Sequence, residues 1–143
     1  MRKLYFLLCL VLTSVTGFSQ LINEPFDYPA STTNGITAQS SSVWAILNNG
    51  NDSILVTPGS LSYPGLAAST GNKISFDGQG VDAYRQLATN QTSTVYASFL
   101  LNVSDLGTLS TTGGYFFGLT PGTTSSTIGT SVWTRKATTG YNI

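Results

Sequence analysis

Short runs of β-branched and aromatic residues recur along the chain, and turn-forming residues separate them. Few segments carry apolar residues at the i, i+3, i+4 spacing of an amphipathic helix. Turn signals such as Pro58-Gly59 and Asp77-Gly78 fall between the apolar runs. Strands of this length with such punctuation are typical of an antiparallel sandwich or barrel. The pattern predicts strands at residues 43–47, 53–57, 73–76, 84–88, 94–103, 115–119 and 131–135.

The clearest of these predicted strands is 94–103, because its apolar residues alternate most regularly. Every second residue from Val95 to Val103 is apolar, which predicts one face that packs against an opposing sheet. The other face carries Tyr96 and Leu100 among polar residues. We therefore expect that face to be partly covered or to line a concave surface.

The N-terminus has the three-part layout of a secretory signal peptide. Arg2 and Lys3 precede the apolar run 4–12, and the small or polar residues 13–20 follow it. The run is too short to cross a bilayer as a helix. Cys9 lies inside the run rather than at the cleavage site, so lipidation is not predicted. We expect a signal peptide at 1–20, a β-sandwich domain at 21–143, a secreted or cell-surface location and no membrane span in the mature chain.

Composition and charge exclude several classes of function. The chain has no His, which rules out a Ser-His-Asp triad, a Cys-His pair and His metal ligands. Its formal net charge is zero, so it lacks the basic surface that binds nucleic acid. The single Cys lies in the predicted leader, and the mature domain must therefore be stabilised without disulfides.

The acidic residues do not form the carboxylate pair that glycoside hydrolysis needs. Glu24 is the only Glu, and no predicted strand carries two carboxylates two or four residues apart. Nearly all the Asp residues sit at turns. We therefore predict that these residues carry no enzyme activity and need no cofactor.

A weak calcium site is the one metal hypothesis that the sequence raises. The loop 77–82 offers the carboxylates of Asp77 and Asp82 together with backbone carbonyls, which are the ligands that calcium takes. The alternative is a Gly-rich hairpin loop in which Asp caps a turn. In a further alternative, Asp82 pairs with Arg85 across the loop.

Sugar binding is the function that the aromatic residues favour. A sugar site needs exposed ring faces with a few polar partners. Trp44 and Trp133 lie in apolar strands, and Tyr96 alternates away from the apolar face of its strand. We therefore name Tyr96, Trp44 and Trp133 as candidate stacking residues. The alternative is that these rings belong to the core.

Three stretches taken in order resemble a known family. The first is 23–29, with an E-x-F-D-Y opening, the second is 61–66 followed by 78–85, and the third is 95–103 leading to 113–117. This order resembles the concanavalin A-like, laminin-G-like jelly-roll module of secreted Bacteroidetes-type proteins, across most of residues 23–136. The resemblance implies a jelly-roll sandwich in a longer exported or surface-attached protein of the type IX secretion route. Such modules mostly carry no assigned activity, so function does not follow from the resemblance.

A modification site also follows from a resemblance. Asp52-Ser53-Ile54 resembles the Asp-Ser/Thr-apolar site at which Bacteroidetes-type bacteria O-glycosylate exported proteins. Ser53 is the candidate acceptor. The alternative is a chance match of three residues in a chain rich in Ser and Thr.

The pattern predicts an all-β, antiparallel sandwich, and the resemblance implies that it is a jelly roll. We expect it to bind or adhere, with an extracellular polysaccharide or a cell-surface glycan as its partner. Two alternatives remain: an accessory domain of a secreted hydrolase whose catalytic residues lie downstream, and a structural spacer. The chain ends after the Gly140 turn, at what resembles the start of another strand. We therefore expect a sandwich that is incomplete at its C-terminus and belongs to a longer protein.

Overall fold

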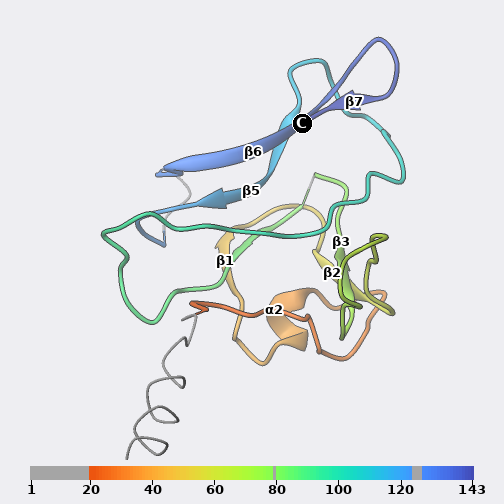
Figure 1. Ribbon diagram of the computed structural model, residues 1–143. Helices are drawn as coiled ribbons and strands as arrows, with labels where there is room; N and C mark the ends of the chain where they lie inside the picture. The colour runs from red at the N-terminus through yellow and green to blue at the C-terminus, as the bar shows by residue number, and fades with distance from the viewer. Residues whose placement is uncertain (1–19, 79, 124–126) are drawn as a thin grey trace, which may run out of the picture.

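The computed structural model describes residues 20–78, 80–123 and 127–143 (Figure 1). The predicted leader at 1–20 lies outside the described residues except for Gln20. Short strands in small antiparallel sheets dominate, with a single one-turn helix in the described part, so the fold is all-β. The elements are α2 (Ile36–Gln39), β1 (Ala45–Asn48), β2 (Leu55–Thr57), β3 (Lys73–Ser75), β4 (Asp82–Tyr84), β5 (Gly114–Leu119), β6 (Thr130–Lys136) and β7 (Tyr141–Asn142).

The strands form three separate antiparallel sheets. β1 pairs with β4, β2 pairs with β3, and β5, β6 and β7 form the third sheet in that order. In Figure 1 the three-stranded sheet lies at the top, and β1 to β4 lie below it with α2. The chain between β4 and β5 runs across the molecule between these two groups in this view. These small sheets establish the all-β class. They do not define a jelly-roll arrangement.

The most buried part of the described chain lies where α2 meets β2. Ile36 is 2% exposed and Val56 is 0% exposed. The Ile36 backbone N–H donates to the carbonyl of Ile54 at 2.7 Å, which ties the start of the helix to the strand. The helix is not extended beyond one turn, because Ser41 and Ser42 adopt left-handed φ angles of 51° and 69°. A single turn is too short to produce the apolar spacing that predicts a helix from sequence.

Most of the predicted strands occur where the pattern placed them. β1, β2, β3, β5 and β6 fall within or overlap the expected segments, and β7 begins at Tyr141, where a further strand was expected. β4 overlaps its prediction only at Tyr84, because the pairing with β1 extends from Tyr84 back to Asp82. None of the described helices is long and apolar enough to reach across a lipid bilayer.

The strand predicted most clearly, at 94–103, is wrong. The described residues of this segment belong to no strand and make no backbone–backbone hydrogen bond to another described residue. Its apolar face is only partly covered: the Phe99 ring packs against Phe116 and Phe117 of β5, with ring centroids 5.8 and 5.0 Å away. The physical reason is that alternation fixes which side chains share a face but does not supply a neighbouring strand to complete the ladder.

Candidate functional site

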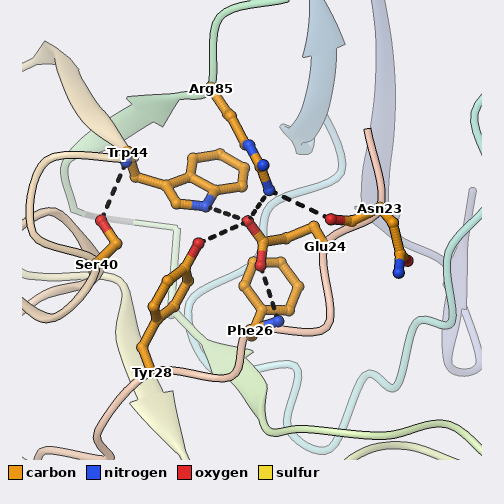
Figure 2. Close-up of polar contacts among 7 residues, drawn as sticks. All are labelled: Asn23, Glu24, Phe26, Tyr28, Ser40, Trp44 and Arg85. Carbon is orange, nitrogen blue, oxygen red and sulfur yellow. Dashed lines mark hydrogen bonds and ion pairs between the residues drawn. The ribbon is translucent and has the colours of Figure 1, made fainter. Parts of the chain in front are cut away.

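The carboxylate of Glu24 is the centre of the largest polar network in the described chain (Figure 2). Its Oε2 accepts hydrogen bonds from the Tyr28 hydroxyl at 2.9 Å and from Trp44 Nε1 at 2.8 Å. The same oxygen forms an ion pair with Arg85 Nη1 at 2.5 Å. The other oxygen, Oε1, accepts the backbone N–H of Phe26 at 2.8 Å. The Glu24 side chain is 11% exposed, so the network lies largely out of water.

A tight local turn brings the N-terminal residues into this network. Phe26 has a left-handed φ of 52°, and its carbonyl accepts the backbone N–H of Tyr28 at 2.7 Å. The Phe26 ring stacks against Trp44 with centroids 5.9 Å apart and an interplanar angle of 29°. On the other side, Ser40 Oγ accepts the backbone N–H of Trp44 at 3.0 Å. Glu24 therefore joins the N-terminal segment to the start of β1 and, through Arg85, to the end of β4.

The electrostatics of this network favour the neutral form of the Tyr28 phenol. Partial burial, followed by the hydrogen bond to Glu24, raises the pKa of Tyr28 above its usual 10.0. A phenol is protonated at neutral pH in any case, and the raised pKa extends the range in which the Tyr28 hydroxyl donates toward alkaline pH. A general acid or base must be able to reach a substrate proton. Glu24 already accepts four donors, so this arrangement is suited to crosslinking the fold.

A second carboxylate, that of Asp82, joins two of the sheets. Asn48 Nδ2 donates to Asp82 Oδ2 at 2.6 Å, and the Asp82 backbone N–H donates to Asn48 Oδ1 at 3.0 Å. The Tyr115 hydroxyl on β5 donates to the same Oδ2. The hydrogen bond to Asp82, followed by desolvation, raises the pKa of Tyr115 to about 12. Asp82 therefore links the β1–β4 pair to the three-stranded sheet.

This link predicts a loss of stability in alkali. A raised phenol pKa means that the stabilisation is complete below the unfolded value near 10 and is lost as the pH rises toward 12. Because Tyr115 is partly solvated, we expect the loss to be about 1 kcal/mol rather than the full linkage value. Urea unfolding at pH 8 and pH 11 measures it in the native chain and in Tyr115→Phe. Because Tyr115→Phe lacks the hydroxyl that binds Asp82, an equal pH dependence in the two proteins would contradict the link.

The structure places the two calcium candidates in different settings. Asp82 lies in β4 and binds Asn48 and Tyr115, whereas Asp77 is exposed in the loop between β3 and β4. No group of three or more His, Cys, Asp or Glu side chains in the described part could hold a metal ion. The alternative pairing of Asp82 with Arg85 is wrong, because Arg85 forms its ion pair with Glu24. Calcium binding stays an untested prediction.

The three candidate stacking residues differ in exposure. Tyr96 is 91% exposed, and Trp133 is 46% exposed with its Nε1 donating to Ser131 Oγ at 2.8 Å. Trp44 is half-buried, with Nε1 committed to Glu24. Within the described residues, no hydrogen bond or ring contact joins any two of these three. Tyr96 is therefore the candidate with the most accessible ring.

The modification candidate Ser53 is half-buried just before β2. Its backbone N–H donates to the Asp52 carboxylate at 2.6 Å, which caps a local turn. The glycosylation prediction stays a prediction.

Sequence reasoning missed the part played by Glu24. It treated Glu24 only as a carboxylate without a catalytic partner. The only signal in the sequence is that the single Glu of the chain lies four residues before Tyr28, whose phenol a nearby carboxylate can accept.

Comparisons of the chain with protein-family models, with curated proteins and with solved structures found no match. The functional argument therefore rests on the side chains themselves, and the resemblance to the jelly-roll module stays a prediction.

Proposed function

We propose that the chain is an exported, non-catalytic binding module with a concanavalin A-like jelly-roll architecture, and that its ligand is an extracellular polysaccharide or a cell-surface glycan. The observation that carries this proposal is the 91% exposure of Tyr96. A ring so open to water presents an apolar face on which a ligand can stack. Sugar rings present C–H faces that stack on such a ring.

Support for a non-catalytic module comes from the engaged carboxylates. Glycosidases place two carboxyl groups across a sugar bond, roughly 5 to 10 Å apart, and each must reach the substrate. Glu24 accepts four donors, and Asp82 accepts from Asn48 and Tyr115. Neither carboxylate is therefore available as an acid or base without dismantling a structural network.

The proposal predicts that Tyr96→Ala weakens glycan binding and leaves the fold intact. Loss of one stacking ring should cost about 0.5–1.5 kcal/mol, or roughly a 2- to 12-fold loss of affinity. A polysaccharide array, read with and without calcium, identifies the ligand, and titration calorimetry then measures the variant. The matched control is Tyr63→Ala, which removes another exposed tyrosine, 65% accessible, from the loop between β2 and β3.

Two outcomes would contradict the proposal. Absence of binding to any polysaccharide at millimolar concentration would favour a structural spacer. Equal loss of affinity in Tyr96→Ala and Tyr63→Ala would mean that binding does not depend specifically on the Tyr96 ring. A requirement for calcium would direct the next substitutions to Asp77 and Asp82.

The proposed export is tested separately by N-terminal sequencing of the secreted chain, which should begin near residue 21.

A further inference from the structure

The segment 94–103, the wrongly predicted strand, has the properties of a strand edge without a neighbour. It runs nearly straight across the molecule in Figure 1 and makes no backbone–backbone hydrogen bond to another described residue. All of its residues are exposed except Val95 and Val103, which are half-buried. Such a row of unpaired N–H and C=O groups is a template for pairing with another strand.

Nothing in the sequence of this segment protects it from pairing. Natural proteins guard exposed edges with charged side chains or Pro. Asp105 is the only charged residue between Arg85 and Arg135, and the segment itself contains neither a charge nor a Pro. Phe99, Leu100 and Leu101 each remain more than a third exposed. This edge carries no charge that could pair with a charged partner. It therefore suits an uncharged strand with alternating apolar residues.

The segment itself is a strand of that description, and its pattern is self-complementary. In an antiparallel pair of two copies centred on Phe99, Val95 faces Val103 and Ala97 faces Leu101 on one side. Every apolar residue on that side then meets an apolar residue, as a two-fold interface requires. We propose that residues 94–103 pair with the same residues of a second copy of this chain, as antiparallel strands centred on Phe99.

This pairing is compatible with the contacts that the segment already makes. Phe99 keeps its packing on Phe116 and Phe117, because new backbone hydrogen bonds lie in the plane of the sheet and side chains stand perpendicular to it. Tyr96 stays on the opposite face and keeps its ring accessible. The pairing therefore does not depend on the proposed function, and Tyr96→Ala should weaken glycan binding while remaining a dimer.

The register gives a sharp test, because Ser98 of one copy faces Leu100 of the other. Light scattering over a concentration series should give the mass of two chains for the native protein. Ser98→Lys with Leu100→Lys places like charges opposite each other twice, and should raise the dimer dissociation constant about tenfold or more. Ser98→Lys with Leu100→Glu places opposite charges there and should restore the dimer. Both positions are exposed, so the fold should tolerate them.

The control for added charge is Thr111→Lys with Thr112→Lys, at two exposed positions outside the segment, which should leave the dimer intact. A native chain that stays a single chain at millimolar concentration would overturn the proposal and mean that something else covers the edge. A dimer that responds equally to the Lys–Lys and Lys–Glu pairs would also overturn it, because the register would then be wrong. Circular dichroism of each variant separates loss of pairing from loss of folding.

Discussion

Replacing Glu24 with Gln should lower the free energy of unfolding by about 2–3 kcal/mol. The amide keeps the size of the side chain but removes the charge that pairs with Arg85. It also turns an NH₂ group toward donors that need an acceptor, since Tyr28 and Trp44 both donate to Oε2. Because the Glu24 side chain is only 11% exposed, water cannot fully replace these bonds.

Urea unfolding followed by tryptophan fluorescence measures this loss, because Trp44 belongs to the network. The matched control is Asp27→Asn, which neutralises an exposed carboxylate three residues away and should change stability by less than about 0.5 kcal/mol. If the two variants unfolded at the same urea concentration, Glu24 would not hold the N-terminal segment in place.

Gly71→Ala should destabilise the protein by about 2–3 kcal/mol, for a reason that also concerns the N-terminal segment. Gly71 has a φ of 77°, a conformation that residues with a Cβ rarely adopt. A Cβ at this position would lie 2.1 Å from the carbonyl oxygen of Pro25, which is a backbone atom that cannot rotate away. The next residue, Asn72, donates its backbone N–H to that same oxygen at 3.1 Å and its side-chain amide to the Tyr28 carbonyl at 2.9 Å.

Gly65→Ala separates the two causes. Gly65 has a comparable φ of 87°, but a Cβ there would meet nothing within 4 Å. It should therefore show only the conformational cost, about 1 kcal/mol. The difference between the two variants, measured by urea unfolding, reports the close approach of Pro25 to the loop between β2 and β3. Equal effects would mean that the N-terminal segment does not dock against Gly71.

The sequence predicted the local elements better than their assembly. The β-branched runs at β2, β3 and β6 and the aromatic run at β5 predicted those strands, because turn residues bound each run on both sides. The segment 94–103 failed for the opposite reason: its pattern is the most regular in the chain, but a strand also needs a partner, and pairing between distant segments leaves no mark on a single sequence.

The candidate residues show the same division. The 91% exposure of Tyr96 did not follow from the alternation, which predicted a partly covered face, because the segment forms no strand and Phe99 and Leu101 on its other face are exposed as well. The position of Trp44 did not follow from its own surroundings, because its indole N–H bonds to Glu24, twenty residues away, and Arg85 reaches the same carboxylate across a still longer stretch of chain. Such long-range polar contacts depend on a fold that sequence pattern does not define.

The most direct test of the binding proposal is an NMR titration of the native chain with the glycan that scores highest on the array. We predict saturable shifts of the Tyr96 ring and its neighbours, while the Trp44 indole N–H, held by Glu24, stays unchanged. Saturable shifts that centre on Trp44 and Glu24 and leave Tyr96 unmoved, or no saturable shifts at all, would contradict the account.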